Sequence, residues 1–251
     1  MTLDIITAPG LAPLRHGFFS RVGGASSGVF AGLNCGFGST DQSDIVQINR
    51  DRVAAAMGVE PHALLGVHQV HSADVATVDG PQGDKQKADG IVTATPGVAL
   101  SVLTADCQPI LFADADAGVI GACHAGWQGA LNGVIDNTVA AMEALGARRD
   151  RIAAVIGPTI SQRAYEVGPE FRDRFLAADD ASARFFVQGR GDRLQFDLPA
   201  YGLHRLARAG VGQAAWTRHC TYSDPVRFFS YRRSVHAKDP DYGRLIAAIT
   251  L

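Results

Sequence analysis

The sequence predicts a mixed α+β fold. Helical and strand patterns alternate irregularly along the chain, and short strands are joined by hairpin-type turns, which favours this class over a regular doubly wound sheet. Of the 251 residues, 47% are hydrophobic and 19% are charged. Such a chain can bury a sizeable core as one large domain or two modest ones. No internal repeat or low-complexity linker divides it.

The first half of the chain is expected to be mostly strands with one helix. The helix spans 44–57, because Ser43 or Asp44 can cap its start and Gly58 can end it. The expected strands are short and apolar, and lie at 16–20, 64–67, 75–78 and 99–103.

The second half is expected to be richer in helix. Apolar side chains recur every three or four residues over 134–145, which predicts an amphipathic helix ending at Gly146. Two further helices are expected at 169–178 and 199–209, each with a proline in its first turn. Strands are expected at 152–156, 213–216 and 228–231.

A β-hairpin is predicted where two apolar runs flank the turn-type residues that begin at Asp114. If its loop has four residues, Ala113 pairs with Gly118 and Cys107 lies opposite His124. Directly opposed strand residues hold their Cβ atoms about 4.5–5.5 Å apart. The two side chains would then reach a single ion.

Cys107 and His124, together with His71, form a candidate metal site. One thiolate and two imidazoles are ligands for a borderline metal such as zinc. Three protein ligands leave a fourth position for water, which distinguishes catalytic zinc sites from closed structural ones. The three residues lie in or beside strand-end loops, where rigid scaffolds carry their chemistry.

Two other chemistries use part of this set. In a cysteine hydrolase, Cys107 would be the nucleophile and His124 its base, with no need for His71. A blue-copper site would add a weak axial methionine, but Met142 lies on the helical stripe, where a core position is expected. The eight histidines are scattered, which disfavours a multicopper oxidase mechanism.

Other side chains near these motifs are candidates for proton transfer or substrate binding. A carboxylate beside the metal could move protons, a guanidinium suits phosphate, and an indole can stack on a planar ligand. The candidate carboxylates are Asp106 and Glu166. The candidate binding residues are Arg21, Trp127, Arg232 and Arg233.

Composition excludes several classes of partner. The formal net charge of −2 gives no reason to expect nucleic acid or an anionic membrane. The four cysteines are widely spaced without a CxxC pair, which favours a reducing compartment. No signal-peptide pattern and no run of ~18 apolar residues is present. We expect a cytoplasmic protein; the sequence does not determine the oligomeric state, and a monomer is compatible with it.

Many short motifs, in this order, resemble the YfiH/laccase-domain family, also described as multicopper polyphenol oxidoreductase-like proteins. They cover most of the chain, and their combination is highly specific. The motifs are His16-Gly-Phe-Phe-Ser-Arg21-Val-Gly-Gly, Leu33-Asn34, Asn49-Arg50, His68-Gln-Val-His71, Ala88-Asp-Gly90, Thr104-Ala-Asp-Cys107, His124-Ala-Gly-Trp127, Gly157-Pro158, Tyr165-Glu-Val-Gly168 and Phe229-Ser-Tyr-Arg-Arg233.

The resemblance implies a single domain over 1–251, folded as a mixed αβ sandwich whose largely antiparallel sheets are flanked by helices. It implies a metal, usually zinc, at His71, Cys107 and His124. It also implies a cytosolic enzyme that phosphorolyses adenosine, inosine, guanosine and methylthioadenosine and deaminates adenosine. An older description is a copper-dependent polyphenol oxidase, and some bacterial relatives are described as peptidoglycan-precursor editing factors.

Two positions depart from the family pattern. Gln128 stands where an arginine is expected after Gly-Trp, which weakens the expectation of phosphate binding and leaves Arg21 or Arg232 to place that ion. The stretch after Gly157-Pro158 lacks the expected cysteines. The three proposed metal ligands are intact.

Overall fold

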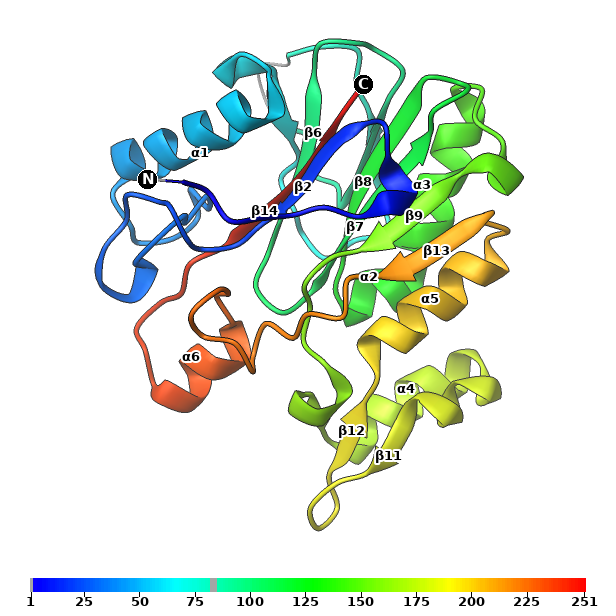
Figure 1. Ribbon diagram of the computed structural model, residues 1–251. Helices are drawn as coiled ribbons and strands as arrows, with labels where there is room; N and C mark the ends of the chain where they lie inside the picture. The colour runs from blue at the N-terminus through cyan, green and yellow to red at the C-terminus, as the bar shows by residue number, and fades with distance from the viewer. Residues whose placement is uncertain (1, 82–84) are drawn as a thin grey trace.

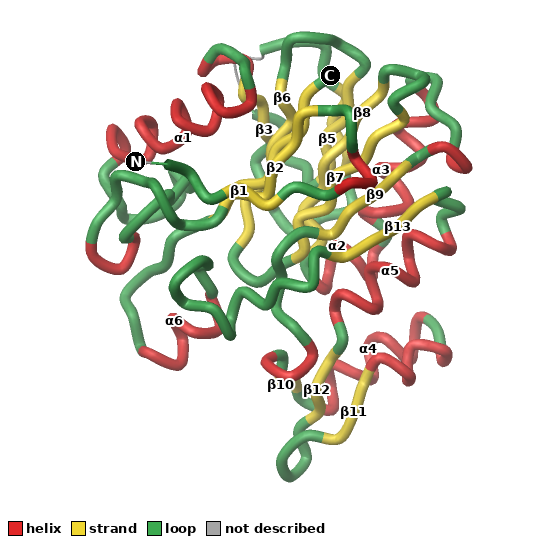
Figure 2. Tube along the Cα trace, in the orientation of Figure 1, coloured by secondary structure: helices red, strands yellow, loops and turns green. Residues whose placement is uncertain are grey.

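The computed structural model describes residues 2–81 and 85–251, and its centre is a pair of β-sheets packed face to face. Helices cover the outer face of each sheet (Figure 1). A third, three-stranded sheet forms a small extension at the bottom of the view (Figure 2). The predicted mixed αβ sandwich is confirmed.

The five-stranded sheet joins the two ends of the chain. Neighbouring strands are antiparallel, except that β3 runs parallel to β6. The last strand, β14, lies between β2 and β6 and is buried along its whole length. In sheet order the strands are β1 (Ile5–Ile6), β2 (Arg15–Phe19), β14 (Leu245–Thr250), β6 (Ala99–Thr104) and β3 (Leu64–Gly66).

The six-stranded sheet carries the predicted hairpin at its centre. Its inner strands are antiparallel, while the edge strands β13 and β4 run parallel to their neighbours. In sheet order the strands are β13 (Gln213–Trp216), β9 (Ala153–Ile156), β7 (Gln108–Asp114), β8 (Val119–Ala125), β5 (Gly90–Thr93) and β4 (Val75–Thr77).

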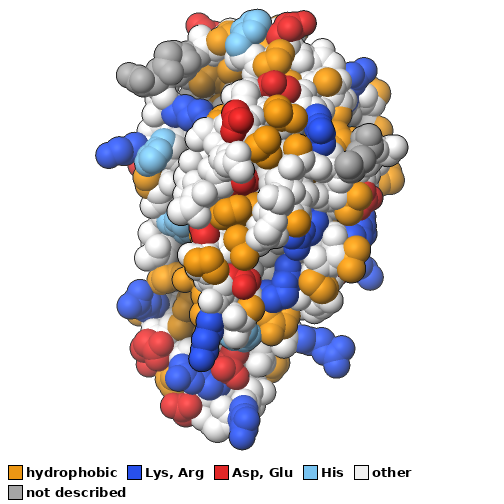
Figure 3. Space-filling model, turned by 90° about the vertical axis from the view of Figure 1, so that its left-hand side faces the viewer, with side chains coloured by type: hydrophobic (Ala, Val, Ile, Leu, Met, Phe, Trp, Pro, Cys, Tyr) orange, Lys and Arg blue, Asp and Glu red, His pale blue; other side chains and the backbone are white. Residues whose placement is uncertain are grey.

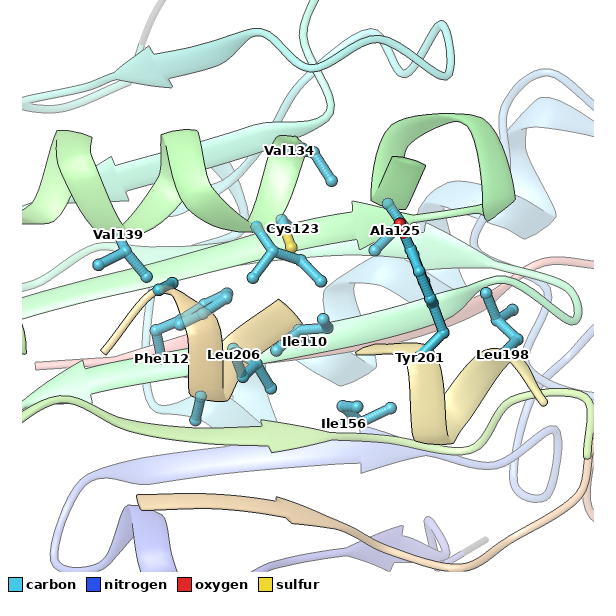
Figure 4. Packing of buried hydrophobic residues seen from close by; sticks show 14 of the residues in the cluster. Ile110, Phe112, Cys123, Ala125, Val134, Val139, Ile156, Leu198, Tyr201 and Leu206 are labelled. Carbon is cyan, nitrogen blue, oxygen red and sulfur yellow. The ribbon is translucent and has the colours of Figure 1, made fainter. Parts of the chain in front are cut away.

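The hydrophobic core has three layers. Between the sheets, Phe18 and Leu100 of one meet Leu111 of the other. Helix α1 (Ser43–Met57) covers the outer face of the five-stranded sheet. Helices α2 (Trp127–Asn132), α3 (Val134–Ala144) and α5 (Leu198–Arg208) cover the six-stranded sheet. Figure 4 shows side chains of β7 and β8 meeting those of α3 and α5.

An aromatic cluster builds the small extension. It joins α4 (Pro169–Ala178) to the third sheet, which consists of β10 (Glu166–Val167), β12 (Leu194–Phe196) and β11 (Phe186–Gln188). The ring of Phe175 lies 4.7 Å from that of Phe196 and 5.0 Å from that of Tyr201 on α5. These packed rings fix the extension against the main body.

On the side seen in Figure 3, basic and acidic side chains are interspersed. Among the described residues, no helix has both the length and the apolar character needed to cross a membrane.

The register of the hairpin differs from the prediction. Asp114 pairs with Val119, so Cys107 does not lie opposite His124. The turn begins one residue later because Gly118 has a φ of 63° and belongs to the turn, while the Asp114 side chain accepts a hydrogen bond from Ala117 N at 3.1 Å. The shift keeps the same side-chain faces, since the four-residue loop is displaced as a whole.

Other elements also differ from the sequence prediction. The expected strand at 228–231 is wrong: Ser230 caps helix α6 (Tyr231–Ala237), its hydroxyl accepting from Arg233 N at 3.1 Å. Helix α1 begins at Ser43, with Gln42 as its N-cap. The strands β1, β5, β10, β11, β12 and β14 are absent from the sequence prediction, since each is short or lacks a clear alternating pattern.

Phe196→Ala should destabilise the protein by about 3–5 kcal/mol, because its fully buried ring is at the centre of the aromatic cluster. The free energy of unfolding from urea titration measures this. Val187→Ala on the neighbouring strand is the control, since Val187 is 49% exposed. Equal effects of the two substitutions would show that the extension adds nothing to global stability.

Candidate metal centre and active site

The three sequence-predicted ligands converge in the structure. One ligand atom from each of His71, Cys107 and His124 lies within 4.8 Å of the others. His71 belongs to the loop between β3 and β4, Cys107 immediately precedes β7, and His124 lies on β8. His71 is exposed, Cys107 half-buried and His124 buried, so the cluster is accessible mainly through its His71 and Cys107 members.

A glycine lets these side chains meet. The register of β7 and β8, extended by one residue, places Cys107 beside Gly126 and diagonal to His124. A Cβ atom on Gly126 would lie 2.9 Å from the Cys107 sulfur and 3.1 Å from the His71 ring. Any side chain at position 126 would therefore push the cluster apart, which explains a glycine directly after His124-Ala.

The carboxylate of Asp89 organises two of the ligands. Its Oδ1 lies 2.7 Å from His124 Nδ1, which leaves Nε2 as the ring atom available to the cluster. Its Oδ2 accepts hydrogen bonds from Val70 N at 3.0 Å and Ser72 N at 2.6 Å. These two amides flank His71, whose φ of 61° is strained for a residue with a side chain. Asp89 thus holds both histidines in place.

Sequence reasoning did not single out Asp89. Its signal was present in the motif Ala88-Asp-Gly90, but nothing in the motif shows that this carboxylate faces a histidine 35 residues further along the chain. A carboxylate behind a ligating histidine is the usual outer support of a metal site.

The electrostatics of the cluster favour a thiolate. Burial acts to raise the pKa of Cys107, but the charge of His124 and hydrogen bonds from both histidines outweigh it and lower this pKa to about 7. Burial acts to lower the pKa of His124, yet Cys107 and Asp89 raise it to about 9. The Asp89 pKa falls to about 2 because its hydrogen bonds to His124, Ser72 and Val70 outweigh burial.

Two pockets flank the cluster, and His71 and Cys107 line both. The first, here the aromatic pocket, has a volume of about 430 Å³. Its walls include Trp127, Tyr165 and Phe171. The second, here the basic pocket, has a volume of about 310 Å³ and is reached also by His124. The lining of the basic pocket also includes Phe37, Val67, Lys85, Tyr242 and Arg244.

Three further predicted residues line the aromatic pocket. Trp127 packs against Phe171, with ring centroids 5.0 Å apart. The guanidinium of Arg232 lies over the Tyr165 ring and donates to the Glu166 backbone oxygen at 2.8 Å. The Glu166 side chain is exposed at the pocket. Their roles in binding or proton transfer remain predictions.

Two predicted arginines line neither pocket. Arg21 donates to Ala31 O from Nε at 2.9 Å and from Nη2 at 2.7 Å, and lies over the Phe229 ring. Arg233 donates to backbone oxygens of Thr221, Tyr222 and Phe228. The structure therefore uses both to hold loops, and brings neither to the cluster.

Asp106 lines the aromatic pocket, but its carboxylate is occupied. It accepts hydrogen bonds from Thr221 Oγ1 at 2.6 Å, Ser230 Oγ at 2.9 Å and Arg232 N at 2.7 Å. Burial raises the pKa of Asp106, against the effect of these hydrogen bonds. The residue ties the start of α6 to the strand end that carries Cys107.

The donor set suits zinc better than blue copper. One thiolate and two imidazoles are present, with a carboxylate behind one imidazole. Of the methionines in the described chain, Met57 and Met142 are both buried in the core and neither lines the two pockets.

The protein is therefore a two-sheet αβ sandwich that carries a candidate metal centre, the His–Cys–His cluster, at one end of its central hairpin. The chain belongs to the family described as multi-copper polyphenol oxidoreductase laccase, whose model matches residues 15–251.

Several known proteins are similar to this chain over nearly its whole length. A Deinococcus radiodurans protein named purine nucleoside phosphorylase is 40% identical over 98% of this chain and 95% of its own. An Escherichia coli protein named purine nucleoside phosphorylase YfiH is 37% identical over 92% and 91%.

Solved structures share the fold. A Neisseria meningitidis protein of the DUF152 family superposes with a TM-score of 0.89 at 34% identity, covering 100% of this chain and 99% of its own. YlmD from Geobacillus stearothermophilus superposes with a TM-score of 0.86 at 28% identity, covering 97% and 93%.

Asp89→Asn should weaken metal binding by about 10- to 100-fold, because the amide lacks the charge and second acceptor that hold His124 and the His71 loop. Competition titration of zinc against a chelator measures the affinity. Asp74→Asn, an exposed neighbour that contacts Asp89 only through its backbone, is the control. Unchanged affinity in a folded Asp89→Asn protein would contradict the assigned role.

The thiol of Cys107 in metal-free protein should be alkylated with a midpoint near pH 7. Its pKa is lowered from 9.0, so the thiolate fraction is small at pH 6 and dominant above pH 7. Iodoacetamide rates, with labelled peptides quantified by mass spectrometry, measure this.

The matched comparison is His124→Ala, which removes the main lowering interaction and should move the midpoint of Cys107 alkylation upward from pH 7. Cys35 and Cys123 serve as internal controls, because burial raises the pKa of both. A midpoint near 9 in the unmodified protein would show that the histidines do not stabilise the thiolate.

Proposed function

We propose that this protein is a zinc-dependent purine nucleoside phosphorylase that accepts adenosine, inosine, guanosine and methylthioadenosine, and that it also deaminates adenosine. The names of the similar proteins support the phosphorylase. The observation that carries the proposal is the placement of a three-ligand cluster directly beside an aromatic pocket. The protein is proposed to act in the cytoplasm.

The cluster suits a zinc ion. Its donors are a thiol whose pKa is already lowered and two imidazoles, one fixed through Nδ1 by Asp89. A zinc ion bound by three side chains supplies an open coordination position and Lewis-acid polarisation of an oxygen.

The aromatic pocket suits a purine. Flat rings from Trp127, Tyr165 and Phe171 offer stacking surfaces for a heteroaromatic base. Glu166 and Glu170 add carboxylates that can hydrogen-bond ring nitrogens or sugar hydroxyls. A nucleoside bound here would have its reacting atoms close to His71 and Cys107, which line the same pocket.

In phosphorolysis, a phosphate oxygen forms a bond to C1′ of the ribose while the bond from C1′ to N9 of the purine breaks. The leaving purine needs a proton at N7, and Glu166 is the carboxylate we assign to it. Arg232 contributes a positive charge at the same pocket, where its guanidinium is held over Tyr165.

A second candidate function rests on a specific observation. The His124 ring is hydrogen-bonded to Cys107 on one side and to Asp89 on the other. Nucleophile, base and carboxylate are arranged in this order in cysteine hydrolases. His71 is the third group at the thiol and has no part in such a triad, so it favours the metal.

Product analysis tests the proposal. Zinc-loaded protein given adenosine should release adenine or hypoxanthine only when phosphate is present, and inosine with or without it. Liquid chromatography separates these products. Adenosine left unchanged in both mixtures would contradict the proposed nucleoside activities. A metal-free protein that is active, and that a thiol reagent then inactivates fully, would support the cysteine hydrolase instead.

Cys107→Ala should abolish zinc binding and both nucleoside activities together, because it removes the only thiolate of the cluster. Cys220→Ser is the matched control: Cys220 is hydrogen-bonded to Ser161 and Ser223 and is not part of the cluster. Metal content and product formation are measured on the same samples. Phosphorolysis that persists after zinc is lost would disprove the catalytic role of the metal.

A further inference from the structure

A third cavity lies beneath α1, at the edge of the sheets, and no step above uses it. Its volume is about 220 Å³. Apolar side chains of β3, β4 and β5 form its floor: Leu64, Leu65, Ala76 and Ile91. Arg50 of α1 and Lys85 are its cationic residues, and we call it the Arg50 cavity.

Arg50 is buried, and no carboxylate in the part of the chain that the structure describes forms an ion pair with it. Its residue is 7% exposed, and its two hydrogen bonds go to Cys35 O and Leu64 O, each at 3.4 Å. Both are longer than the usual 2.7–3.2 Å, so they compensate the desolvated charge only weakly. Among the described residues, no carboxylate lines the cavity. Asp51 interacts with Arg50 through space, but its side chain accepts from Gln47 at 2.7 Å.

A second cation faces the same aromatic ring. The Arg50 guanidinium lies 5.6 Å and the Lys85 ammonium 5.9 Å from the centroid of Phe37. Desolvation and then the charge of Arg50 lower the pKa of Lys85, as expected for two neighbouring cations. Cation–π contacts of this kind are weak compared with the desolvation cost of a buried charge, so they do not replace a counter-ion for the guanidinium.

The geometry points to a phosphate-binding site: we propose that the Arg50 cavity takes a phosphate group, as free inorganic phosphate or as the phosphate of a small phosphomonoester. A planar guanidinium donates to two phosphate oxygens at once, and an ammonium at the mouth adds a point charge. The apolar floor offers room for the organic part of an ester.

The location connects this site with the metal cluster. Phe37, Val67 and Lys85 line both the Arg50 cavity and the basic pocket, which reaches His71 and Cys107. A phosphate group at Arg50 would therefore lie along the wall that leads to the cluster. Its binding does not depend on the proposed phosphorylase activity.

Isothermal titration of the full zinc-loaded chain tests the site, with inorganic phosphate, adenosine monophosphate and adenosine as ligands at constant ionic strength. Lys85→Ala should weaken phosphate binding about tenfold or more, as expected for loss of a charge-assisted contact. Lys87→Ala, an exposed lysine two residues away that does not line the cavity, should bind as the unsubstituted protein does.

Arg50→Lys should also weaken phosphate binding, because lysine keeps the positive charge but cannot donate to two phosphate oxygens at once. The melting temperature of this variant shows whether it is folded. Should it fail to fold, Lys85→Ala alone decides. Tighter binding of adenosine monophosphate than of inorganic phosphate identifies an ester as the ligand, and the reverse order identifies the free ion.

Equal phosphate affinity in the Lys85→Ala, Lys87→Ala and unsubstituted proteins, or no phosphate binding to any of them, would overturn the proposal. Cys107→Ala separates this result from the proposed function: it should retain phosphate affinity at the Arg50 cavity after nucleoside turnover is lost.

Discussion

One buried carboxylate, that of Asp89, supports the geometry of the candidate metal centre. It lies at the start of the strand pair β4–β5, where its own backbone oxygen accepts from His124 N at 2.7 Å. Burying a charge is costly unless it is hydrogen-bonded, and here every contact also positions a ligand. One oxygen orients the His124 ring and the other holds the amides on both sides of His71. The fully hydrogen-bonded carboxylate therefore fixes two histidines that come from separate parts of the chain.

The thiol reaches this pair by a different route. Cys107 lies directly before the first residue of β7. Its neighbour Asp106 joins this end of the strand to α6 through hydrogen bonds to its carboxylate. The β7–β8 register then aligns it with Gly126, and the missing side chain there creates the space that the sulfur and the His71 ring occupy. The cluster is thus a product of two carboxylates and one glycine as much as of its three ligands.

The four arginines considered for phosphate binding differ in their surroundings. Arg21 and Arg233 donate short hydrogen bonds to backbone oxygens and stabilise loops. Arg232 faces the aromatic pocket, while Arg50 is buried with only long contacts to carbonyls. A guanidinium suits phosphate in either environment, but only Arg232 and Arg50 line a cavity that could hold one. The position occupied by Gln128 lacks a charge, so the proposed phosphate binding rests on these other cations.

The sequence by itself determined the local features: the periodic helices, most apolar strands, the three residues of the His–Cys–His cluster and the family. Periodicity and turn residues are local signals, and ligand types are chosen by chemistry. The tertiary structure decided what depends on long-range contacts. It placed β14 at the centre of a sheet between strands from both halves of the chain, turned 228–231 into a capped helix start, and set the hairpin register. It also revealed Asp89 behind His124, and it buried Arg50 where no described carboxylate pairs with it, because pairing and burial arise only once distant segments are packed together.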